Sequence, residues 1–188
     1  KGEITLIHTL GKIPAKRIIV LGLGKVENFD TNVIRWASGV LARHIRRIGV
    51  SVVATIVHGS GIGGLNPRKA ASAMVEGVLL GLYKFDKYKS DKGKKTLERL
   101  TVMDTDSAKV ADVEAGVLEG IVIAEAVNRC RNMANEPANL MTPTNMAEAA
   151  LDIANNGAME IQVLERVDME RLKMGAFLGV SQGSAEPP

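Results

Sequence analysis

The stretch His58–Gly64, HGSGIGG, has the residue types of a phosphate-binding loop. Its glycines follow the Gly-x-Gly-x-x-Gly spacing of dinucleotide-binding loops, in which backbone N–H groups at a helix start face a pyrophosphate. Here the signals for a helix start come only at Asn66 and Pro67. An acidic residue about 20 positions further on would be Asp86, within a lysine-rich segment instead of at a strand end. We therefore interpret the loop as a tight turn between a strand and a helix.

The chain offers few residues for metal binding or nucleophilic catalysis. Its histidines and its single cysteine are His8, His44, His58 and Cys130. They show neither the His-Glu-x-x-His spacing nor the paired cysteines of metal sites, and neither Ser60 nor Ser184 lies in a Gly-x-Ser-x-Gly sequence. We expect structural or surface histidines and a buried Cys130 on a helix. The residues thus predict no catalytic, metal-binding or cofactor-binding position.

Positive charge gathers in one segment, although the whole chain carries only +3, from 24 Lys and Arg against 21 Asp and Glu. Phe85 and Tyr88 in this segment could stack on bases. The near balance of charge favours a solvated loop over a nucleic-acid site. The lysines concerned are Lys84, Lys87, Lys89, Lys92, Lys94 and Lys95.

The pattern of apolar residues predicts alternating strands and helices before residue 134. Asp30 or Thr31 would cap the first helix, Gly49 would end it, and Asn66 would cap the second. The near-continuous apolar run at 50–57 is typical of a strand covered on both faces. We expect strands at 4–10, 17–23, 50–57 and 97–104 and helices at 30–48, 67–85 and 106–133.

A second unit follows the segment at 132–145, which is rich in proline and asparagine. We expect a helix at 144–156 capped by Thr144, a strand at 160–165, a short helix at 168–175 and a strand at 176–183. The alternation indicates an α/β fold with a largely parallel sheet. Two strands are too few for an independent sheet, so we expect the second domain to be incomplete.

Two stretches of the second unit resemble segments of the leucyl aminopeptidase family, also called cytosol aminopeptidases. They are NEPANLMTPTNMAEAA at 135–150 and MGAFLGVSQGSAEPP at 174–188. The sequence EGVLLGLYKFDKYKSDK at 76–92 is similar to the end of the N-terminal domain of that family, and RIIVLGLGK at 17–25 to one of its early strands. Together the resemblance covers nearly the whole chain.

The resemblance implies a macro-like N-terminal α/β domain at 1–108, a connecting helix at 109–134 and the beginning of a catalytic domain at 135–188. Members of the family are cytoplasmic homohexamers that remove N-terminal amino acids from peptides. They use two divalent metal ions, Mn or Zn, and a metal-bridging water that attacks the scissile carbonyl. The same resemblance implies a peptide substrate for the parent protein. The longest apolar stretches, such as 50–57, are far shorter than the roughly 18 residues needed to cross a bilayer, so we expect no membrane partner.

The family's metal and catalytic sequences resemble KGLTFDSGG and NTDAEGR, and neither occurs in these 188 residues. We therefore expect the metals to be bound by residues beyond Pro188, and the chain alone to be inactive. Two binding alternatives stay open. One is DNA binding through the lysine-rich segment with Arg43, Arg46 and Arg47, and the other is binding of an ADP-ribose-type ligand at the glycine loop.

Overall fold

The first two strands form an antiparallel hairpin in the computed structural model, which describes residues 1–60, 64–91, 97–157 and 159–188. Strand β1 (Ile4–His8) pairs with β2 (Arg17–Leu21), with Ile4 opposite Leu21 and His8 opposite Arg17. Both strands lie where the β-branched residues predict them. The turn between them is stabilised by the Thr9 hydroxyl, which donates to the Ala15 carbonyl at 2.7 Å.

The other described strands form a parallel pair, β3 (Val52–Ile56) with β4 (Arg99–Met103). Val52 lies opposite Arg99 and Ile56 opposite Met103. Helix α2 (Pro67–Leu82) lies between them in sequence, so β3, α2 and β4 form the strand–helix–strand unit that a parallel connection requires. The expected α/β class is confirmed. Among the described residues, β3 and β4 form a small parallel sheet, and the β1–β2 hairpin is a separate antiparallel sheet.

The helices begin and end close to their predicted positions. Helix α1 (Thr31–Arg47) is capped by Asp30, whose carboxylate accepts from the Val33 N–H at 2.8 Å, and Gly49 follows it at φ +67°. The Asn66 side chain accepts from the Lys69 N–H at 3.1 Å and caps α2. Of the two candidates for the first cap, the structure therefore selects Asp30. A short 3-10 helix, η1 (Val26–Asn28), precedes α1.

Glycines allow the helices to pack backbone against backbone. A Cβ atom at Gly77 of α2 would collide with the Arg35 carbonyl oxygen of α1, and one at Gly81 would meet Gly39. The long helix α3 (Val110–Asn135) approaches α2 in the same way at Gly116 and Gly120. It follows the 3-10 helix η2 (Ser107–Lys109) and confirms the predicted long helix. Ala and Gly positions thus set the spacing of this helical layer.

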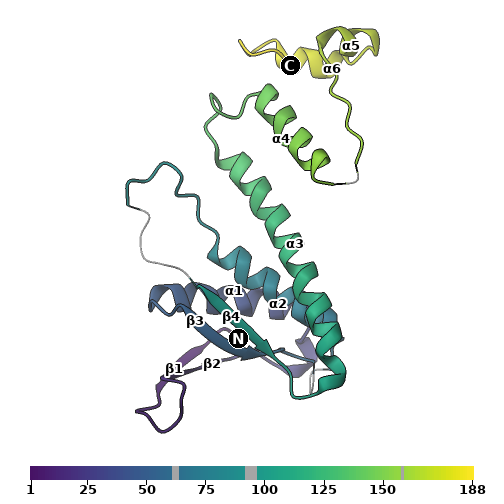
Figure 1. Ribbon diagram of the computed structural model, residues 1–188. Helices are drawn as coiled ribbons and strands as arrows, with labels where there is room; N and C mark the ends of the chain where they lie inside the picture. Colours follow the sequence, from purple (N-terminus) through teal and green to yellow (C-terminus); the bar gives the residue numbers. More distant parts are fainter. Residues whose placement is uncertain (61–63, 92–96, 158) are drawn as a thin grey trace. The chain divides into compact units, whose positions relative to one another are not determined.

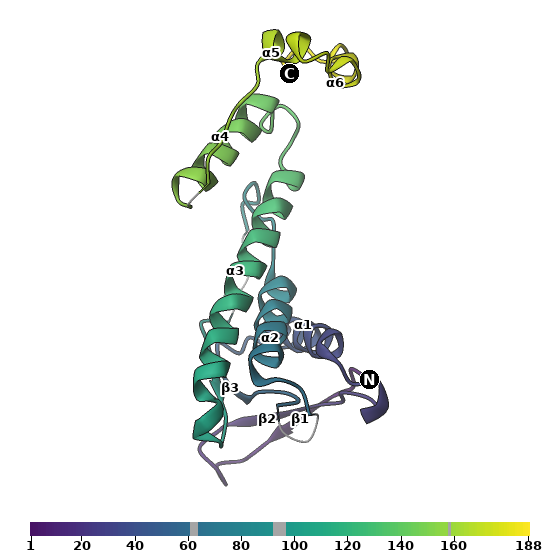
Figure 2. The same ribbon diagram turned by 90° about the vertical axis from the view of Figure 1, so that its right-hand side faces the viewer.

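In the described part of the chain, one face of β3 is more exposed than the other. Figures 1 and 2 show α1 and α2 on the same side of the strands. Alternate β3 side chains are half-buried or exposed, with Val52 at 50% and Ile56 at 60%. The prediction of a strand covered on both faces is therefore wrong for the described residues. The core lies between helices and strands and contains Ile34, Val57, Ala70, Ala71, Ala73, Met74 and Val113.

The chain divides into two compact units, Lys1–Arg129 and Cys130–Pro188, here called the N-terminal and C-terminal units. In the C-terminal unit, α4 (Pro143–Asn155) begins one residue earlier than predicted. Its cap is Thr142, not Thr144, because Pro143 occupies the first helical position, where its missing N–H costs no hydrogen bond. The Thr142 hydroxyl accepts from the Asn145 N–H at 3.4 Å.

Both strands predicted for the C-terminal unit are wrong. The segment 160–165 lies outside any ladder among the described residues, since a strand requires a hydrogen-bonded partner. The segment predicted as a strand at 176–183 contains helix α6 (Gly175–Ser181), because a short apolar run does not distinguish a strand from a helix. The short helix predicted at 168–175 is present as α5 (Arg166–Arg171).

Candidate functional site

The described ends of the glycine-rich loop have the geometry of a turn. Gly59 has φ +87°, and a Cβ atom there would collide with the Phe29 ring. The Leu65 N–H donates to the Gly59 carbonyl at 3.0 Å and brings the two ends of the loop together. The central residues 61–63 lie outside the described residues. The phenylalanine ring thus occupies space that a side chain at Gly59 would need.

Ser60 joins the carboxyl ends of the two parallel strands. Its hydroxyl donates to the Asp104 carboxylate at 2.9 Å, and the Asp106 N–H donates to the other oxygen of Asp104 at 3.0 Å. These hydrogen bonds, that of Asp106 first, hold the pKa of Asp104 below its usual value. A carboxylate with a lowered pKa is a weak base and does not activate a serine. The arrangement therefore links strand ends and lacks the features of a nucleophilic site.

The predicted structural histidines lie apart along the chain. His8 ends β1 and is exposed, whereas His44 on α1 has its Nδ1 2.9 Å from an Arg47 guanidinium nitrogen. His58 follows β3, and its burial lowers its pKa. Cys130 lies on α3 as expected, but it is exposed, so the prediction of a buried cysteine is wrong. Within the described ranges, no group of three or more His, Cys, Asp or Glu side chains could hold a metal ion.

The other predicted polar candidates make local contacts. The hydroxyl of Ser184 accepts from the Glu186 N–H at 3.0 Å in an exposed turn. The Lys87 ammonium lies 5.3 Å from the Tyr88 ring centre, and the rings of Phe85 and Tyr88 meet edge to face at 5.9 Å. Lys92, Lys94 and Lys95 lie outside the described residues.

Arg46 is held by a structural contact at the end of α2. Its guanidinium donates to the Leu82 carbonyl at 3.1 Å, one of the last carbonyls of that helix. This contact joins the C-terminal ends of α1 and α2. Arg46 therefore serves the packing of the two helices, a role that the sequence pattern did not indicate.

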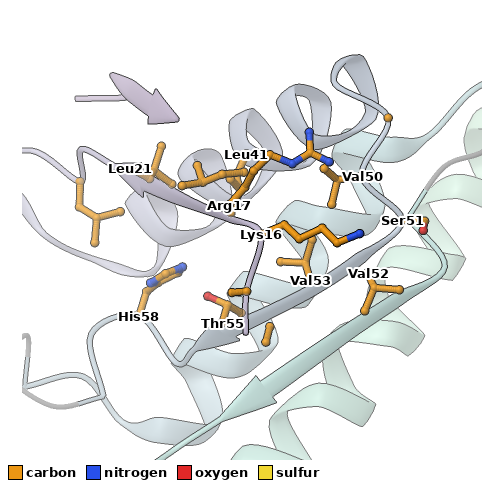
Figure 3. Close-up of a pocket in the computed structure, with 15 residues that line it drawn as sticks. Lys16, Arg17, Leu21, Leu41, Val50, Ser51, Val52, Val53, Thr55 and His58 are labelled. Carbon is orange, nitrogen blue, oxygen red and sulfur yellow. The ribbon is translucent and has the colours of Figure 1, made fainter. Parts of the chain in front are cut away.

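A groove of about 560 Å³ lies between β2 and β3 (Figure 3). Its floor is apolar and includes Ile19, Leu21, Leu41 and Val53. Lys16 and Arg17 lie at one side, and His58 lies at one end. The sequence did not predict this groove, because it depends on which strands pair. The available signal was the pair of cations, Lys16 and Arg17, at the start of an apolar strand.

Two domain models of one protein family match the two parts of the chain. The model for the N-terminal domain of the cytosol aminopeptidase family matches residues 1–92, and the model for its catalytic domain matches residues 128–188. A probable cytosol aminopeptidase of Alkaliphilus oremlandii is 40% identical over 190 residues, which cover 100% of this chain and 38% of that protein. The chain belongs to the cytosol aminopeptidase family. The resemblance seen in the sequence is thereby confirmed.

Solved structures agree with the family assignment. A tomato leucine aminopeptidase variant matches with a TM-score of 0.84 and 25% identity, over 100% of this chain and 36% of that one. The bottromycin maturation enzyme BotP in complex with Mn shares the fold, with a TM-score of 0.81 and 24% identity over 99% of this chain and 37% of that one. The chain thus spans less than two fifths of the length of these proteins.

The matches to known proteins also bear on the two binding alternatives, which were DNA binding and binding of an ADP-ribose-type ligand. Neither the family models nor the named relatives support the DNA-binding alternative. The ADP-ribose alternative stays a prediction, because the middle of the glycine loop lies outside the described residues. No helix of the described residues is long and apolar enough to cross a membrane.

Proposed function

We propose that this chain supplies the N-terminal part of an aminopeptidase, which releases N-terminal amino acids from peptides. The observation that carries the proposal is the order of the two family matches. The N-terminal domain model ends at residue 92 and the catalytic domain model starts at residue 128, within α3. The names of the relatives, probable cytosol aminopeptidase and leucine aminopeptidase, indicate the reaction class.

Within this proposal the chain has three parts. Residues 1–108 form a macro-like domain with a structural or regulatory role, 109–134 form the connecting helix, and 135–188 begin the catalytic domain. We further propose a cytoplasmic homohexamer. The positions of the family matches and the length of α3 support the division into parts.

The described residues do not fit a metal site of their own. Two divalent ions need several carboxylate or imidazole ligands, and the described part of the chain brings together no group of three such side chains. We therefore assign no metal-dependent step to residues 1–188. The Mn in the BotP structure supports metal dependence of the parent enzyme. Two divalent ions, Mn or Zn, bound by residues beyond Pro188, are part of our proposal.

The test compares two polypeptides with the same substrate. The 188-residue chain and the longest polypeptide encoded by its gene are purified free of host peptidases and incubated with a leucine-based chromogenic substrate and added manganese. We expect turnover by the longer polypeptide and none by the 188-residue chain. An N-acetylated substrate is the control, because an aminopeptidase requires a free N-terminal amine.

Each arm has an outcome that contradicts one part of the proposal. A longer polypeptide that leaves the free-amine substrate intact with Mn and with Zn argues against the aminopeptidase function. Turnover by residues 1–188 at an enzymatic rate would show that the catalytic groups lie within this chain.

A further inference from the structure

Asn156 is the only asparagine of this sequence that is followed by glycine. In such a pair the backbone nitrogen of the glycine can attack the side-chain carbonyl carbon of the asparagine, because glycine has no Cβ atom to hinder the approach. The other asparagines precede larger residues or, at Asn66, a proline that has no N–H. The pair Asn156–Gly157 is therefore the point of the sequence with the lowest steric barrier to this reaction.

Both residues of the pair are exposed and lie at the end of α4. Asn156 directly follows the last residue of the helix, and residues 159–165 form neither helix nor strand. Of the residues of α4, only Ala154 is buried. Few packing contacts therefore hold this end of the helix, and its last turn can open at a small cost in free energy.

Hydrogen bonds of this last turn hold both reacting groups. The Gly157 N–H donates to the Ala154 carbonyl at 3.1 Å. The side-chain amide of Asn156 donates to the Asp152 carbonyl at 2.8 Å and to Asp152 Oδ1 at 3.2 Å. Attack requires the release of both groups, and the opening of a single helical turn releases them together. The contacts therefore slow the reaction and couple it to local opening of α4.

We propose that Asn156 is a site of spontaneous deamidation. When the last turn of α4 opens, hydroxide removes the proton of the Gly157 N–H, and the nitrogen attacks Asn156 Cγ. As the new C–N bond forms, the side-chain nitrogen takes up a proton from water and leaves as ammonia, so that a succinimide results. Water then opens the ring at either carbonyl and gives aspartate or isoaspartate. The whole reaction consumes water and releases ammonia, and the proposal does not depend on the aminopeptidase function.

The product places a negative charge at an unfavourable end of the helix. The last carbonyls of α4 carry partial negative charge, and the Asp152 carboxylate accepts from the Asn156 amide. A carboxylate at position 156 has no proton to donate, so two acids would face each other instead. Because α4 lies within residues 128–188, which match the catalytic domain model, we expect the modification to loosen the start of that domain.

The test is peptide mass spectrometry on the longest polypeptide encoded by the gene, incubated at slightly alkaline pH. We expect Asn156 to gain about 1 Da, because its amide becomes a carboxyl group. This residue should react before any other asparagine and should yield both aspartate and isoaspartate. The rate should increase with pH, because the attacking nitrogen must lose its proton. The 188-residue chain, incubated in parallel, should react at the same residue.

Substitutions separate the attacking group from the opening of the helix. Gly157→Ala should reduce modification of Asn156 to the level of the other asparagines, and its Cβ atom would lie 3.3 Å from the Ile153 carbonyl oxygen, which requires only a small shift. Gly175→Ala is the matched control, because it adds the same methyl group in the same unit after a methionine. Asp152→Ala should increase the rate about twofold to tenfold, as expected for loss of one exposed hydrogen bond.

Three results would overturn the proposal. The first is an unmodified Asn156 in the longer polypeptide under conditions in which a synthetic peptide of residues 152–160 deamidates, which would show that the fold protects the pair. The second is aspartate as the sole product, because direct hydrolysis of the amide forms no isoaspartate. The third is an equal rate in Gly157→Ala, which would exclude attack by the unhindered glycine nitrogen.

Discussion

The two units of the chain contain similar apolar side chains but bury them to different degrees. In the N-terminal unit, Ile34, Ala37 and Met74 are at most 1% exposed. Among the described residues of the C-terminal unit, only Ala154 and Met169 are buried hydrophobic residues, while Val167 is 74% and Val180 is 85% exposed. Apolar content alone therefore does not form a core. Close contact between elements is also required, and glycines supply it in the N-terminal unit.

The largest expected contrast is in local stability. Backbone amides of α2 should exchange only through global unfolding, with a free energy on the order of 5 kcal/mol or more, because α2 is packed against α1 and α3. Amides of residues 160–164 should exchange with opening free energies near zero, since these residues lie outside any ladder among the described strands. Native-state hydrogen exchange measures both. Equal protection of the two regions would remove the contrast.

A methyl group at the tightest glycine should damage the N-terminal unit strongly. Gly77→Ala places a Cβ against the Arg35 carbonyl oxygen, so α1 and α2 must separate. We expect a loss of about 2–3 kcal/mol in the free energy of unfolding. Urea denaturation followed by circular dichroism measures it.

The control for this substitution lies in the C-terminal unit. A methyl group at Gly179 of α6 would have no neighbouring atom within 4 Å among the described residues, so alanine there fits without displacement. Gly179→Ala should leave stability unchanged or raise it slightly, because alanine favours a helix more than glycine does. Similar losses for both variants would show that glycine contacts are not what distinguishes the units.

Removal of the buried carboxylate between α1 and α2 should have a smaller effect. Glu76 is 7% exposed and accepts from Arg35 Nε at 2.7 Å and from the Ser72 hydroxyl at 3.2 Å. The hydrogen bond to Glu76 raises the pKa of Arg35. Glu76→Ala should cost about 1–2 kcal/mol, because the Arg35 side chain is 35% exposed and regains contact with water. Thermal denaturation measures the loss.

The exposed ion pair between Arg68 and Glu119 is the control for the buried pair between Arg35 and Glu76. Arg68 Nε and Glu119 Oε2 are 2.9 Å apart, with side chains 55% and 46% exposed. Glu119→Ala should cost between about 0 and 1 kcal/mol, since water and salt screen exposed pairs. A loss as large as that of Glu76→Ala would show that burial does not set the strength of these contacts.

The smallest expected effect is a pH dependence from His58. Burial lowers its pKa below the ordinary value of 6.5, so the unfolded chain binds the proton more readily than the folded chain. Stability is therefore complete above pH 6.5 and falls as the pH drops from there to the lowered pKa. In His58→Gln this decline should be smaller in denaturant titrations between pH 7 and 5. His8→Gln, at the exposed end of β1, controls for the loss of a histidine.

Local sequence signals were sufficient for most of the N-terminal unit. Asp30, Gly49 and Asn66 act through neighbours a few residues away, so their types alone indicated where helices begin or end. The exposure of β3 was not predictable in this way. It depends on which elements cover the strand, and an apolar run does not specify them.

The same limit explains the errors in the C-terminal unit and at the groove. Ile161 and Val163 alternate with polar residues as in a strand, but a ladder needs a partner that the described residues do not provide. The groove depends on the absence of pairing between β2 and β3, which is a property of the tertiary fold. The resemblance to the cytosol aminopeptidases, in contrast, rests on short segments whose residue types alone indicate the family.

The uncovered strand edges also affect how the chain behaves at high concentration. Edges with free backbone groups beside exposed apolar residues, here Val20, Val52 and Ile56, are templates for pairing between molecules. We therefore expect molecules of this chain to associate through the edges of β2 and β3 as protein concentration rises.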